Sequence, residues 1–144
     1  MWLGICKNQA RMKLIFKISC ILFLLAGSGL SKAQTSTDDV FVPISKYVSQ
    51  GNTEALSAWF DDNLEVTILS HGGMSSKAQA KQIIKSFFRT HTPESFEVNH
   101  TAGRSNMKYI LADLKAGGEL YHVILFLNSQ SGTYRIQQIK IDKI

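Results

Sequence analysis

Three residues in the C-terminal half of the chain have the chemistry of a general-base site: Asp113, His122 and Tyr109. Asp113 and His122 lie on either side of Gly117-Gly118, and two glycines supply the positive φ angles of a two-residue hairpin turn. Such a turn places Asp113 opposite His122 and puts Tyr109 on the same face. An imidazole that a carboxylate orients could abstract a proton, and the Tyr109 hydroxyl could stabilise an oxyanion.

A second interpretation places the same pair on the surface. The other face of these two strands is more apolar, and we expect it to lie under the helices. Its residues are Ile110, Ala112, Leu114, Tyr121, Val123, Leu125 and Leu127. Asp113 and His122 would then lie on the outer face, where such a cross-strand pair is usually solvated and weakly stabilising.

The outer face is also expected to be partly apolar. The residues that predict this are Leu111, Ile124, Phe126, Tyr134 and Ile136. A sheet that is apolar on both faces needs two covers, and the helices suffice for one. We therefore expect a homodimer that forms through the outer sheet face.

Periodicity predicts two short helices at the start of the domain. The first follows an apolar stripe over residues 40–48, with Asp38 and Asp39 available as N-caps. The second is capped by Asn52 and buries apolar residues of the segment 55–60, including Trp59 and Phe60.

A third, longer helix is expected from Ser76 to about Thr90. Ser76 and Gln79 form a capping box, and apolar residues recur at helical spacing behind them. Its exposed side carries a basic row of Lys77, Lys81, Lys85 and Arg89. This row is typical of a solvated helix face, and the alternative is contact with an anionic partner.

Alternating apolar residues predict five strands, at residues 64–69, 96–101, 108–114, 119–127 and 133–142. Asp61-Asp62-Asn63 is predicted to be a turn before the first strand, and His71-Gly72-Gly73 is predicted to end that strand. A shift in apolar phase predicts a β-bulge near Gln137-Gln138. The result is an α+β fold with helices on one face of a curved, mainly antiparallel sheet, in the order α-α-β-α-β-β-β-β.

The first 34 residues have the three parts of a secretory signal peptide. A basic start from Met12 is followed by an apolar run over residues 18–26 and by the small-residue site Ser31-Lys32-Ala33. We expect cleavage after Ala33 or Gln34, with Met12 as an alternative start. The apolar run is too short for a membrane span, so a bacterial protein in the periplasm or outside the cell is expected, with no stable membrane insertion.

Removal of this segment makes the chain formally neutral. Five of the 16 Lys and Arg residues precede residue 35 and all 11 Asp and Glu residues follow it, which leaves 11 charges of each sign. No nucleic-acid partner is therefore expected. Both cysteines, Cys6 and Cys20, are removed, and His71 has no second ligand at metal spacing. We expect neither a metal nor a cofactor.

Two pairs of segments carry a family resemblance. Residues 59–66, Trp59-Phe60-Asp61-Asp62-Asn63-Leu64-Glu65-Val66, and the meander Tyr109 to Ile141 resemble the nuclear transport factor 2-like superfamily, also called the cystatin-like cone. Leu69-Ser70-His71-Gly72-Gly73 and Ile136-Gln137-Gln138-Ile139 resemble an exported bacterial family, domain of unknown function 4783. The resemblance covers nearly all of residues 38–144. Since this part of the sequence has no internal repeat or linker, we expect one domain over residues 35–144.

The superfamily includes dehydratases, isomerases and epoxide hydrolases, and also members that only bind ligands or form dimers. We therefore expect a non-enzymatic exported module that binds a small apolar ligand or a protein partner. The alternative is a dehydratase, isomerase or hydrolase in which His122 is the base, Asp113 orients it and Tyr109 donates a hydrogen bond.

Overall fold

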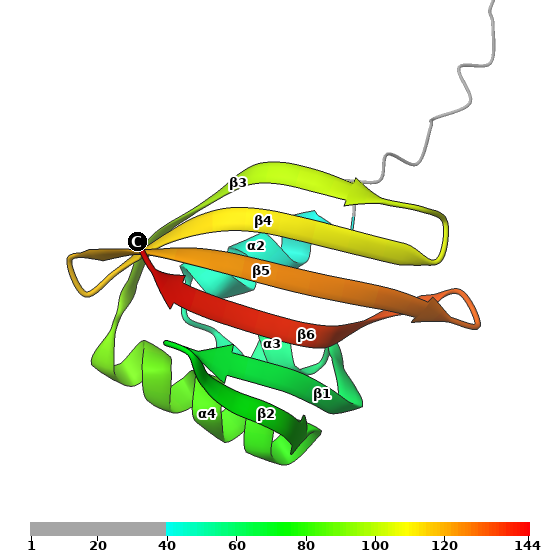
Figure 1. The fold of residues 1–144 in the computed structure, drawn as a ribbon, viewed down its shortest axis with the longest axis horizontal. Helices are drawn as coiled ribbons and strands as arrows, with labels where there is room; N and C mark the ends of the chain where they lie inside the picture. Colours follow the sequence, from blue (N-terminus) through cyan, green and yellow to red (C-terminus); the bar gives the residue numbers. More distant parts are fainter. Residues whose placement is uncertain (1–39) are drawn as a thin grey trace, which may run out of the picture. The chain divides into compact units, whose positions relative to one another are not determined.

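A computed structural model describes residues 40–144, which lie within one compact unit, Thr35–Ile144. A curved six-stranded sheet in the order β2-β1-β6-β5-β4-β3 carries three helices on one face (Figure 1). This arrangement confirms the α+β fold class. The predicted signal peptide and the predicted caps Asp38 and Asp39 lie outside the described residues.

Helix α2, Phe41–Ser49, begins after Val40, which occupies the N-cap position without a side-chain hydrogen bond. Gly51 ends it with φ +63°. The N–H groups of Gly51 and Asn52 donate to the carbonyls of Val48 and Tyr47 at 3.0 and 2.9 Å, the pattern of a Schellman motif. The Asn52 side chain then caps α3, as predicted.

Helix α3, Thr53–Ser57, is shorter than predicted. Trp59 and Phe60 are not helical, and strand β1, Phe60–Ile68, includes the predicted turn Asp61-Asp62-Asn63. Both predictions were wrong for the same reason. The Trp59 carbonyl accepts a hydrogen bond from the Ile136 N–H at 2.7 Å, and Phe60 lies opposite Ile136, so pairing with β6 extends this segment.

Strand β2, His71–Ser76, was not predicted and is paired antiparallel with β1. The first strand ends just before His71-Gly72-Gly73, as predicted, but these residues begin β2 and are not a loop. The chain reverses at Leu69 and Ser70, which have φ angles of 51° and 66° although neither is glycine. At Gly72 the backbones of β2 and β1 are too close for a side chain, since a Cβ added there would lie 1.9 Å from the Val66 carbonyl oxygen.

Helix α4, Lys77–Thr90, has the predicted limits and the predicted capping box. The Ser76 hydroxyl accepts from the Gln79 N–H at 3.3 Å, and the Gln79 side-chain oxygen accepts from the Ser76 N–H at 3.0 Å. Among the described residues, no helix is both long and apolar enough to cross a membrane.

The remaining strands are β3 Pro93–Gly103, β4 Met107–Ala116, β5 Glu119–Gln130 and β6 Thr133–Lys143. They form an antiparallel meander, and β6 also pairs in parallel with β1. The turn at Gly117-Gly118 gives the predicted register, with Asp113 opposite His122. Gln137 is the extra residue of the predicted bulge, because Phe126 faces Gln138 and Leu127 faces Ile136.

The core lies between the helices and the inner face of the sheet. The face predicted to lie under the helices does so, and Ile110, Ala112, Leu114, Tyr121, Val123, Leu125 and Leu127 are all buried. The bulge turns Ile136 to the same side as Ile139 and Ile141, and Tyr134 packs against this core. The prediction that Tyr134 and Ile136 lie on the outer face was therefore wrong.

Candidate functional site

The predicted site residues lie on the sheet face that the helices leave uncovered. Asp113 of β4 and His122 of β5 are directly opposite each other, and 2.7 Å separates Asp113 Oδ1 from His122 Nδ1. Their side chains are 31% and 51% exposed. The pair therefore forms in solvent on the outer face, as the second interpretation of the sequence expected.

Neighbouring strands complete the surroundings of this pair. Hydrogen bonding from the Asn99 side chain, and then from His122, lowers the pKa of Asp113 below its ordinary value of 3.8. On its other side His122 faces Asp142, which forms an ion pair with Lys140 at 3.0 Å. Since Asp113 occupies Nδ1, Nε2 is the ring nitrogen left for proton transfer.

Tyr109 lies on the same face but apart from the pair. It is half-buried opposite Phe126, and the paired residues Leu111 and Ile124 stand between it and the Asp113–His122 pair. The arrangement thus has a base with an orienting carboxylate on an open surface. Within residues 40–144, no group of three His, Cys, Asp or Glu residues could hold a metal ion.

An apolar patch occupies the middle of the same face. It consists of Tyr109, Leu111, Ile124 and Phe126, which are all half-buried, and we call it the outer patch. The helices lie on the opposite side of the sheet and do not cover it (Figure 1). Its flanks carry charges of both signs, with Glu65 on β1, Lys140 on β6 and Glu97 on β3.

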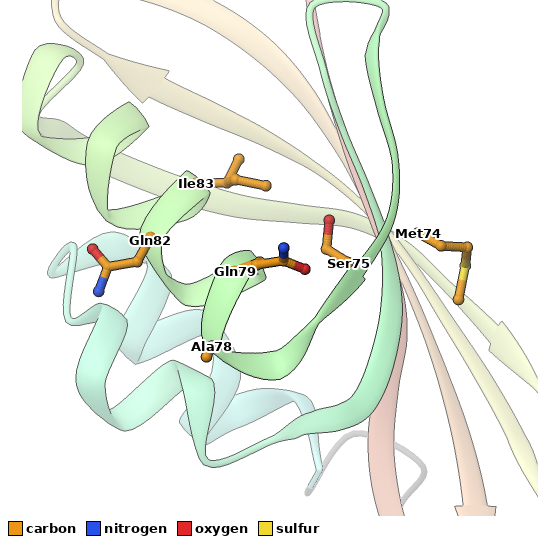
Figure 2. Close-up of a pocket in the computed structure, with 6 residues that line it drawn as sticks. All are labelled: Met74, Ser75, Ala78, Gln79, Gln82 and Ile83. Carbon is orange, nitrogen blue, oxygen red and sulfur yellow. The ribbon is translucent and has the colours of Figure 1, made fainter.

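Sequence reasoning missed a groove between β2 and α4, which we call the edge groove. Its volume is about 520 Å³, and it is lined by Met74, Ser75, Ala78, Gln79, Gln82 and Ile83. Met74 is 72% exposed and Ile83 38%. Figure 2 shows Gln79 reaching from α4 toward Ser75 of β2, with Ile83 further along the helix. The edge groove could not be predicted from the sequence, because one of its walls is β2, which was not predicted.

The family model described as "Domain of unknown function (DUF4783)" matches residues 41–142. A DUF4783 family protein from Bacteroides uniformis ATCC 8492 is 25% identical with a TM-score of 0.69, over 71% of this chain and 94% of that one. One from Bacteroides fragilis YCH46 is 22% identical with a TM-score of 0.68, over 72% and 97%.

An NTF2-like protein of unknown function from Cytophaga hutchinsonii ATCC 33406 is 11% identical with a TM-score of 0.55, over 78% of this chain and 94% of that one. None of the curated proteins matches the chain. These likenesses agree with the resemblance expected from the sequence, and they describe a fold without assigning an activity.

Proposed function

Since the chain belongs to the DUF4783 family and has an NTF2-like fold, we propose that it is an exported, non-enzymatic binding module that pairs with a second copy of itself. The outer patch is the observation that carries this proposal. It is the apolar part of a sheet face that no helix of the described chain covers.

A second copy is the occupant that the surroundings of the patch favour. A two-fold axis through the patch brings the same surface of both chains together. The flanks hold two acids, Glu65 and Glu97, and one cation, Lys140. Such a mixed border allows Lys140 of one copy to face an acid of the other, which sets the register of the pair.

The edge groove is the proposed place for a small apolar ligand. Its volume of about 520 Å³ lies within the usual range for ligand pockets. Met74 and Ile83 offer it exposed apolar surface, while Ser75, Gln79 and Gln82 offer a few polar groups. This combination suits an apolar molecule that carries one hydrogen-bonding group.

Export is proposed from the signal-peptide pattern of the first 34 residues, with the periplasm or the exterior as destination. Expression of the full chain in a bacterial host should give a protein whose first residue, by N-terminal sequencing, is Gln34 or Thr35. Recovery of the uncleaved chain from the cytoplasm would contradict export.

Dimer formation is tested by sedimentation of the protein recovered after expression of the full chain. Wild type is expected to be a dimer at a protein concentration of roughly 10 µM, because an interface of standard size stays formed at that concentration. Ile124→Lys is expected to be a folded monomer, because it places a charge in the outer patch. Val42→Lys is the matched control, since Val42 is exposed on α2. A monomeric wild type, or a dimeric Ile124→Lys protein, would refute the pairing.

The 2.7 Å contact between Asp113 and His122 favours a second candidate function, an enzyme of the dehydratase, isomerase or hydrolase kind. Its open position on the sheet argues for the binding role, since catalytic bases usually line concave pockets. A panel of substrates for these three reactions tests it. Loss of an activity in His122→Ala, but not in the exposed control His100→Ala, would establish the enzyme.

A further inference from the structure

The basic row on α4 separates into three environments in the structure. Lys81 pairs with Glu54 at 2.6 Å. Lys77 lines a polar pocket together with Asp61 and Asp62. The last two members, Lys85 and Arg89, form no ion pair within residues 40–144.

Lys85 and Arg89 line a further pocket, which we call the cationic pocket. It has a volume of about 330 Å³ and lies where the end of α2 and the start of α3 meet the last turns of α4. The two residues are four apart on one helix, so both cations reach the same space. The two cations are therefore positioned to act on one anionic group.

Nearby acids are engaged elsewhere. Glu54 is held by Lys81, and Glu94 pairs with Lys115 at 3.0 Å while accepting a hydrogen bond from the Gly118 N–H at 2.8 Å. These contacts lower the pKa of both carboxyl groups, so both stay ionised and bound to their own partners. Glu54 also interacts electrostatically with Lys85 and offsets part of the charge of the cationic pocket, whereas none of these contacts involves Arg89.

The rest of the cationic pocket is mainly apolar. Phe88 is buried and forms its floor together with Pro93. Gly51 keeps one side open, because a Cβ added there would lie 3.3 Å from Pro93 Cδ and 3.9 Å from Phe88 Cβ. A ligand here would meet charge at one end and apolar surface at the other.

Thr53 adds a polar group to this pocket. The residue is only 5% exposed, and its hydroxyl forms no hydrogen bond to the described part of the chain. Thr53 is one of the residues that line the pocket. Its hydroxyl could donate to an acceptor oxygen of a ligand.

We propose that the cationic pocket binds a small organic carboxylate. The carboxylate lies between Lys85 and Arg89, and its apolar body lies against Phe88 and Pro93. A guanidinium matches the two oxygens of a carboxylate, and an ammonium adds a second positive charge. The volume is at the low end for ligand pockets, which limits the ligand to a small molecule.

The test uses sodium octanoate as the probe and ¹⁵N-labelled protein recovered after expression of the full chain. Octanoate is expected to shift the amide signals of Thr53, Phe88 and Arg89. Octan-1-ol, which lacks the charge, is expected to bind at least about tenfold more weakly, as is the Arg89→Gln protein. Lys77→Gln removes a charge from the same helix outside this pocket and should bind octanoate within about twofold of wild type.

Three results would overturn the proposal. One is the absence of any shift at about 10 mM octanoate, where even weak binding is visible. Another is a set of shifts confined to the edge groove or the outer patch. The third is an Arg89→Gln protein that binds octanoate as wild type does while its spectrum remains that of a folded protein.

Discussion

Asp113 shows how cross-strand neighbours decide the state of a single side chain. Its pairing with His122 could be predicted, because a two-residue turn fixes the register of the two strands that it joins. Its contact with Asn99 could not, since β3 carries a bulge between Val98 and His100 that sequence alternation does not reveal. The carboxylate thus contacts side chains of two neighbouring strands, and only the contact with His122 could be predicted.

The lowered pKa of Asp113 predicts a pH dependence of stability. Folding favours its ionised form, so the contribution is complete above the ordinary pKa of 3.8 and disappears as the pH falls through the lower, folded-state value. In urea unfolding, Asp113→Asn should be less stable than wild type at pH 7 by at most about 1 kcal/mol. The difference should shrink below about pH 4.

Asp62→Asn is the matched control, because the Asp62 side chain has no hydrogen bond or ion pair to the described residues. It should change the free energy of unfolding little at pH 7. An Asp113→Asn difference that stays constant between pH 7 and pH 3 would contradict the assignment.

Among the elements, the helices were predicted better than the edge of the sheet. The capping box of α4 is a local signal, and it fixed the start of that helix correctly. Strand β2 has no such signal, because its sequence from His71 to Ser76 contains two glycines and one large apolar residue, Met74. It is a strand because β1 pairs with it, a tertiary effect that overrides local preference.

The bulge in β6 explains the other error. Alternation from Tyr134 and Ile136 differs in phase from alternation at Ile139 and Ile141, which correctly indicates an inserted residue. Because of the inserted residue, the apolar residues before the bulge and those after it all face the core. The prediction that Tyr134 and Ile136 lie on the outer face did not take this into account. Apolar residues on either side of a bulge should therefore be placed on one face.

The glycine pair of β2 gives a prediction at this scale. Gly72→Ala should lower the free energy of unfolding by about 2 kcal/mol or more, because its Cβ would lie 1.9 Å from the Val66 carbonyl oxygen and push β2 away from β1. Gly73→Ala is the control, since no atom lies within 4 Å of a Cβ there. Equal stabilities of the two variants, measured in urea, would show that β2 is not paired as described.

In the whole molecule, β6 joins the two halves of the sheet. It pairs with β5 of the meander and in parallel with β1, so that neither half of the sheet is complete without it. The sequence predicts the meander from its turns, but parallel pairing between distant strands leaves no local signal. The edge groove could not be predicted either, because one of its walls is β2, which was not predicted. The basic row could be predicted from its helical spacing.

This topology predicts a single cooperative unfolding transition. The chain has two tryptophans, and Trp2 lies in the segment whose removal we propose. The recovered protein should therefore keep only Trp59, which packs against the core next to β1. Fluorescence of Trp59 should therefore change at the same urea concentration as far-ultraviolet circular dichroism. Separate transitions would mean that the meander unfolds independently of β1.

The place of β6 also affects how the protein is made. The sheet is completed by the last of its six strands to leave the ribosome, although that strand lies between β5 and β1 in the finished order. Until it emerges, β1 has no strand on the side away from β2, and β5 has none on the side away from β4. A chain that lacks β6 cannot form the complete sheet, so we expect the native fold only after the last strand has been synthesised.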